Sequence, residues 1–110
     1  MKPNHTYKLE VRGATAIGRP SGSGDQFTVF AGAIADAHCT MEFETCNRFN
    51  KELRDQMIAL GYLNLEQTPD LLGTPRYRLA TDFTFSSPSC AASVLAGRQI
   101  DGIAEWRQYP

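Results

Sequence analysis

The first thirty residues carry three short apolar runs, and their spacing restricts the fold more than any other feature. Thr6–Val11 alternates apolar and polar side chains, as a half-buried strand does. Gly13 ends that run, Ala14–Ile17 forms a second, and Gln26–Phe30 forms a third. Residues 18–25 contain three Gly and one Pro, which predicts a loop. Short strands that follow one another this closely predict an antiparallel meander.

A helix is predicted from Asn47 onward. The preceding residues 33–46 are ambiguous, because Ala33-Ile34-Ala35 fits either the extension of a strand or the start of a short helical turn. Four apolar residues at helical spacing share one face of this helix, and the charged residues fall elsewhere. Thr45 or Asn47 can cap its start, and Gly61 stands where a left-handed residue ends a helix. The predicted apolar face consists of Phe49, Leu53, Met57 and Leu60, and the polar positions are Lys51, Glu52, Arg54 and Asp55.

A second helix is predicted to begin at Ser87, with that serine as the N-cap and Pro88 at the first helical position. Small residues fill Cys90–Ala96, and Gly97 ends the helix. Beyond it, the pair Asp101-Gly102 predicts a tight turn.

These patterns predict an α+β fold with a small antiparallel sheet of four to five strands and two packed helices. Tyr77–Leu79 supplies a further strand, and the aromatic side chains of Phe85 and Trp106 are assigned to the core. The chain has 110 residues, so we interpret residues 1–110 as a single domain.

The charge balance argues against non-specific binding to nucleic acid by the whole surface. Lys and Arg number 11 and Asp and Glu 12, for a net charge of −1. Binding to phosphates would therefore need a local basic patch. Residues 36–44 carry three acidic side chains, whereas the segment from Arg76 to the end carries four Arg against three acidic residues. This asymmetry is compatible with one basic face and equally with a mixed, solvated surface.

The N-terminus lacks the apolar stretch of a signal peptide, and no run approaches the length of a membrane span. We therefore expect a cytoplasmic protein with no membrane partner. Its three cysteines, an odd number, are then expected to be reduced.

No catalytic or metal motif stands out, so we expect a non-enzymatic protein with no cofactor. His38, Cys39, Glu42 and Cys46 could form a metal site, but the cysteines lie seven residues apart and form no C-x-x-C pair. A small hydrolase using His38 and Cys39 is a weaker alternative, because adjacency in the sequence does not place a base against a nucleophile.

The segment from Phe85 to Trp106 carries a recognisable pattern. It reads F-S-S-P-S-C-A-A at the helix start, then Gly97-Arg98, Asp101-Gly102 and Glu105-Trp106-Arg107. This resembles a small C-terminal domain of GIY-YIG endonucleases and restriction–modification proteins, and the related restriction-enzyme adenine-methylase-associated (RAMA) domain. The resemblance extends weakly to residues 14–107. The chain departs from it at Ala31-Gly32-Ala33, where the family commonly has Lys-Gly-Ser, and at Cys90, where a smaller residue is usual.

The resemblance implies a non-catalytic, DNA-associated module of the restriction–modification or mobile-element type that binds duplex DNA, including modified DNA. A helix N-terminus can hold a phosphate, although the serines there can equally serve only as caps. The candidate DNA-binding residues are Arg76, Arg78, Ser87, Ser89, Arg98 and Arg107. The alternative is a protein-interaction module or phage-type inhibitor that binds a nuclease or methylase subunit through the acidic residues Asp36, Glu42 and Glu44.

Overall fold

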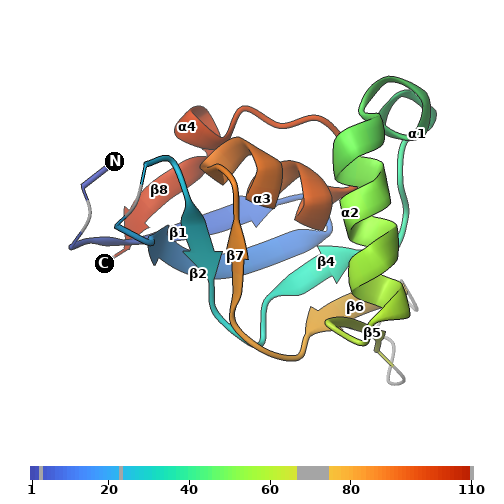
Figure 1. Ribbon diagram of the computed structural model, residues 1–110, viewed down its shortest axis with the longest axis horizontal. Coiled ribbons are helices and arrows are strands. Elements are labelled where there is room, and N and C mark those ends of the chain that lie inside the picture. The colour runs from blue at the N-terminus through green and yellow to red at the C-terminus, as the bar shows by residue number, and fades with distance from the viewer. Residues whose placement is uncertain (3, 23, 67–74, 110) are drawn as a thin grey trace.

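The computed structural model describes residues 1–2, 4–22, 24–66 and 75–109 (Figure 1). Within these residues the chain forms one antiparallel sheet of eight strands, with four helices. The strands are β1 (Thr6–Val11), β2 (Ala14–Pro20), β3 (Phe27–Val29), β4 (Ile34–Asp36), β5 (Leu63–Leu65), β6 (Arg76–Leu79), β7 (Phe83–Phe85) and β8 (Trp106–Tyr109). The helices are α1 (Met41–Cys46), α2 (Arg48–Ala59), α3 (Pro88–Ala96) and α4 (Gly102–Glu105).

The α+β assignment with four to five strands and two helices is therefore wrong in its element count. The strands that were not assigned, β4, β5, β7 and β8, are three or four residues long and show little alternation in the sequence. Their pairing partners come from distant parts of the chain and stabilise them as strands. The resulting fold is still mixed but is richer in sheet than predicted.

The sheet runs in the order β5-β6-β4-β2-β1-β8, and β3 also pairs with β2 and then with β7. The predicted N-terminal meander is confirmed, because β1 pairs with β2 and β2 pairs with β3. The predicted loop begins too early, since β2 continues through Pro20. The extension pairs with β3, and a Cβ at Gly18 would lie 2.5 Å from the Thr28 carbonyl and 2.6 Å from the Phe27 ring, so the glycine allows this close approach.

Helix α3 lies across the sheet and provides the centre of the core (Figure 1). Its predicted ends are confirmed: the Ser87 hydroxyl accepts a hydrogen bond from the Cys90 amide at 3.0 Å, and Gly97 is left-handed with φ of +71°. All residues from Cys90 to Ala96 are buried. The small side chains let the helix approach the strands closely. Phe85 and Trp106 are buried as predicted, and the Trp106 indole donates to the Pro88 carbonyl at 3.0 Å.

Helix α2 is oriented differently from the prediction. Met57 is buried, but Phe49 is 69% exposed and Leu60 is 72% exposed. Arg54, predicted to be polar surface, is only 2% exposed. Its guanidinium donates to the Val94 carbonyl of α3 and to the Asp36 carbonyl of β4. The helix is thus held to the core by a buried cation as well as by apolar packing.

Two shorter helices were not predicted. Thr40 caps α1, its hydroxyl accepting from the Phe43 amide at 3.1 Å. Asp101-Gly102, predicted as a tight turn, instead begins α4, because the Asp101 carboxylate accepts from the Ile103 amide at 3.1 Å. In the described part of the chain, no helix is long and apolar enough to cross a membrane.

Candidate nucleic-acid interface

Helices α2, α3 and α4 pack against one face of the sheet, and the opposite face is lined by exposed or half-buried side chains. Directly opposed residues in an antiparallel pair point to the same side. The register therefore gives the composition of the second face. Lys8 opposes Ile17 and Arg107, Thr15 opposes Ile34, and Ile34 opposes Arg78. We call this surface the open face.

Two cations meet at one end of the open face, where β1 and β8 pair. Lys8 and Arg107 are directly opposed there. The Lys8 ammonium also forms an ion pair with Glu10 at 2.8 Å and lies 5.3 Å from the centre of the Tyr109 ring. The hydrogen bond with Glu10 raises the pKa of Lys8 and lowers the pKa of Glu10, so both remain charged at neutral pH. Arg107 is exposed beside them.

Two further cations lie on β6. Arg78 opposes Ile34 of β4 and Asn64 of β5, and its Nε atom forms an ion pair with Glu66 at 2.9 Å. Arg76, two residues along the same strand, faces the same side and opposes Asp36. From β6 to β8 is four strand spacings, roughly 19 Å.

Arg19 adds a fifth cation to the open face, because it lies two residues from Ile17 on β2 and is exposed. Glu10 and Asp36 are the acidic residues that the strands place on the same face, and Glu66, just after β5, joins them through its ion pair with Arg78. The open face therefore carries an excess of positive charge although the chain is net negative. Lys8 and Arg19 were not among the predicted site residues, although the alternation of polar residues along β1 and β2 indicates their side of the sheet.

The predicted site residues divide between the two sides of the sheet. Arg76, Arg78 and Arg107 share the open face, whereas Ser87, Ser89 and Arg98 lie at the two ends of α3, on the helical side. The hydroxyls of both serines accept hydrogen bonds from backbone amides. Ser87 accepts from the Cys90 amide, and Ser89 accepts from the Gly102 amide at 3.0 Å. Each serine therefore has a structural role, and the six residues do not form one patch.

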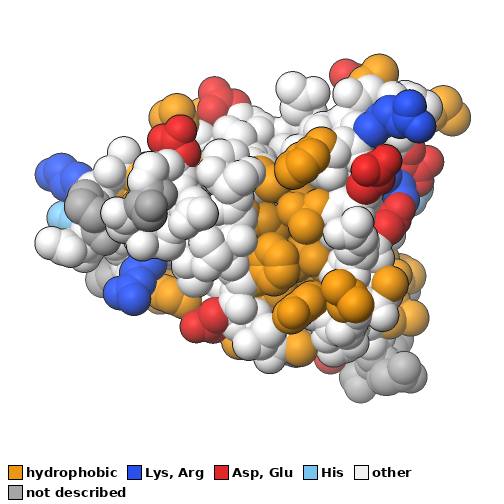
Figure 2. All heavy atoms as spheres, in the orientation of Figure 1, with side chains coloured by type: hydrophobic (Ala, Val, Ile, Leu, Met, Phe, Trp, Pro, Cys, Tyr) orange, Lys and Arg blue, Asp and Glu red, His pale blue; other side chains and the backbone are white. Residues whose placement is uncertain are grey.

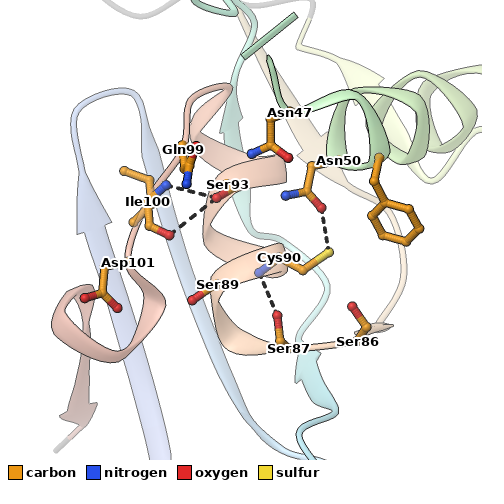
Figure 3. A pocket seen from close by; sticks show the side chains of 11 residues that line it. Asn47, Asn50, Ser86, Ser87, Ser89, Cys90, Ser93, Gln99, Ile100 and Asp101 are labelled. Atoms are coloured by element: carbon orange, nitrogen blue, oxygen red, sulfur yellow. Dashed lines mark hydrogen bonds between the residues drawn. The ribbon is translucent and has the colours of Figure 1, made fainter. Parts of the chain in front are cut away.

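The helical side contains a separate groove of about 510 Å³ (Figure 3). Helix α3 forms its floor, Asn47 and Asn50 stand on the α2 side, and Gln99 and Asp101 stand on the other side. We call this the polar groove. Its remaining lining residues are Phe49, Ser86, Ser87, Ser89, Cys90, Ser93 and Ile100.

The cysteines are all free, and two of them lie in environments that disfavour a thiolate. Burial raises the pKa of Cys39, and the nearby charge of Arg54 lowers it by less. Burial also raises the pKa of Cys90, and a hydrogen bond with Ser86 lowers it by less. A reactive cysteine needs the opposite shift. Among the described residues there is no group of three or more His, Cys, Asp or Glu side chains placed to hold a metal ion.

Comparison with known proteins gives one family. Searches against curated proteins and against solved structures find no significant match. A family model described as a domain of unknown function, DUF4357, matches residues 7–109. That range runs from the second residue of β1 to the end of β8 and so includes all of the sheet except Thr6. The chain therefore belongs to the DUF4357 family.

Proposed function

We propose that this protein is a non-catalytic, DNA-associated module that binds duplex DNA through the open face of its sheet. The observation that carries the proposal is the register-defined set of five cations on that face, which includes three of the four predicted arginines. Arg and Lys side chains make most protein contacts to DNA phosphates. The finer assignment, a relationship to the RAMA domain and to restriction–modification proteins, is part of this proposal and rests on the pattern from Phe85 to Trp106.

A duplex titration tests the proposal. Labelled 20-mers, with and without N6-methyladenine, are titrated at low and at moderate salt while fluorescence anisotropy is followed. We expect micromolar binding that weakens as salt rises, because bound cations release counterions from the duplex. Tighter binding of the methylated duplex would identify a reader of modified DNA. No binding at either salt concentration would refute the proposal.

A second candidate, a protein-interaction module, is favoured by the apolar surface on the helical side. Figure 2 shows hydrophobic side chains gathered in a band beside α2. Phe49 on this helix, Leu60 at its C-cap and Tyr62 beyond it are exposed although they are large and apolar. Contiguous apolar surface of this kind often marks a protein contact.

The two candidates can be separated by one pair of variants. Leu60→Asp places a charge on the exposed apolar residue that ends α2, and Ile103→Asp places the same charge on an exposed apolar residue of α4. Loss of a co-purified protein partner in the first variant alone would support the interaction module. Equal recovery of that partner with both variants would refute it.

A further inference from the structure

We infer that the polar groove binds a nucleobase, presented either by a free nucleoside or by single-stranded nucleic acid. The groove and the open face lie on opposite sides of the sheet, so the two surfaces can be occupied independently. Its volume of about 510 Å³ lies within the range of roughly 300–1,000 Å³ typical of small-molecule sites.

An exposed aromatic ring forms part of the lining. Phe49 has 69% of its surface exposed, although a phenyl side chain gains free energy by leaving water. It is the second residue of α2 and borders the polar groove. Nucleobases stack on such rings without regard to sequence, because every base has a π-face. The position of Phe49 therefore offers a stacking surface at the edge of a preformed groove.

Amide side chains provide the polar contacts. The Oδ1 atom of Asn50 accepts a hydrogen bond from the Cys90 thiol at 3.1 Å. This bond does not use the side-chain amino group of Asn50. The Asn47 side chain makes no capping hydrogen bond to α2, and Gln99 is exposed across the groove (Figure 3). A carboxamide presents a donor beside an acceptor, which is the arrangement that pairs with the edge of a base.

The floor of the groove is fixed by internal hydrogen bonds. The Ser93 hydroxyl accepts from the Ile100 amide at 3.0 Å, and Ser87 holds the Cys90 amide. The Ser93 bond ties α3 to the residues that precede α4, and the Cys90 thiol, which donates to Asn50 Oδ1, ties α3 to α2. Both sides of the groove are therefore joined to its floor before any ligand arrives, which reduces the entropy lost on binding.

The charge of the groove selects against a phosphate. Its lining residues include no Lys or Arg, and Asp101 is their one acidic residue. An anion would meet no cationic side chain there, whereas the exocyclic amino group of adenine, cytosine or guanine can donate to the Asp101 carboxylate oxygen that does not cap α4. The chemistry therefore fits the base rather than the backbone of a nucleotide.

The test is an NMR titration of the ¹⁵N-labelled protein that follows the side-chain amide signals of Asn47, Asn50 and Gln99. One arm uses the four free ribonucleosides, and the other uses a mixed-sequence single-stranded DNA 8-mer. We expect saturable shifts of these signals in at least one arm. Phe49→Ala should weaken that binding by about 5-fold to 150-fold, the range for losing one base–aromatic stack. Leu60→Ala, an equally exposed apolar residue near the other end of α2, should leave it unchanged.

Several results would overturn the inference. One is the absence of saturable shifts with any nucleoside and with the 8-mer. Another is binding that Phe49→Ala leaves intact, or shifts produced equally by the blocked peptide N-acetylglycylglycine amide, which would indicate a site for peptide groups. Binding of the 8-mer that Arg107→Ala removes and Phe49→Ala does not would assign the strand to the open face. Because free nucleosides carry no phosphate, their binding does not depend on the duplex titration, and the two proposals can fail separately.

Discussion

Lys8 and Arg107 lie directly opposite each other across the β1–β8 pair, so two cations are neighbours on the open face. Like charges opposed in this way destabilise a sheet. Glu10 offsets part of this repulsion through its 2.8 Å ion pair with Lys8, but Arg107 has no ion pair among the described residues. An anionic ligand bound at Arg107 would relieve the repulsion.

Replacing Arg107 by alanine should therefore weaken duplex binding. We expect the plot of log affinity against log salt concentration to become shallower by about one unit, because one phosphate contact is lost. Arg48→Ala is the matched control, since Arg48 is exposed at the start of α2 on the helical side. Equal losses in the two variants would contradict binding by the open face.

Arg54→Met should lower the free energy of unfolding by about 3 kcal/mol. The methionine fills much of the space but leaves the Val94 and Asp36 carbonyls without the donors that now satisfy them. Urea unfolding monitored by circular dichroism measures the change. Arg48→Met, made at an exposed position of the same helix, should change stability by less than about 0.5 kcal/mol. A similar small change at Arg54 would show that its hydrogen bonds add little.

Alanine variants at two glycines distinguish the cost of backbone strain from the cost of a steric clash. Gly61 and Gly97 both have positive φ, +84° and +71°, but a Cβ at Gly61 meets open space and one at Gly97 would lie 2.5 Å from the His38 carbonyl. Gly61→Ala should cost about 1 kcal/mol from strain alone. Gly97→Ala should cost about 2–4 kcal/mol, because the close contact adds to the strain. Thermal unfolding compares the two, and equal losses would be contrary to the packing described.

Serine variants at the start of α3 decide whether Ser87 has a function beyond capping. Ser87→Ala should destabilise the protein by about 1 kcal/mol, whereas Ser87→Asp should retain the cap. If Ser87 only caps the helix, Ser87→Asp binds duplex DNA as the unmodified protein does. A large loss of duplex affinity in Ser87→Asp, with stability preserved, would instead place a phosphate at this residue.

The thiols should differ in reactivity. Cys46 is exposed and Cys90 is buried, so iodoacetamide should modify Cys46 in the folded protein and Cys90 only after unfolding. Mass spectrometry of timed samples distinguishes the sites. Rapid modification of Cys90 in the folded protein would contradict its burial.

The raised pKa of Cys90 also gives a pH dependence. Burial holds the folded pKa above the ordinary value of 9.0, so the folded state favours the protonated thiol. This contribution to stability is complete below pH 9.0 and is lost as pH rises through the folded pKa. Urea unfolding should therefore show a smaller loss of stability above that pH in Cys90→Ala than in the unmodified protein. Equal losses would mean that other groups control the alkaline transition.

Local signals in the sequence predicted some elements well. The N-terminal meander follows from alternation between glycines, and the ends of α3 follow from Ser87, Pro88 and Gly97, whose backbone preferences act within a few residues. The strand count could not be obtained in this way, because β4 and β7 become strands through partners elsewhere in the chain.

Only part of the candidate site could be predicted from the sequence, again because strand pairing between distant residues decides which side chains share a face. The sequence marks Arg76, Arg78 and Arg107 as cations, but only the register shows that they share a face, and that Ser87 does not. Arg54 was assigned to the surface because a charged side chain ordinarily stays in water. Its partners are two carbonyls, 18 and 40 residues away, and carbonyls carry no signature in a sequence.

The pairing of β1 with β8 has a consequence for protein synthesis. Thr6 and Tyr109 are neighbours although 103 residues separate them, and the Thr6 hydroxyl donates to the Tyr109 carbonyl. While the chain is being made, β1 therefore has β2 on one side and an unpaired edge on the other until the last strand emerges. Completing the sheet closes a loop of nearly the whole length of the domain, which predicts late, slow consolidation. A ribosome-bound chain that stops before β8 would expose that edge of β1 to other nascent strands.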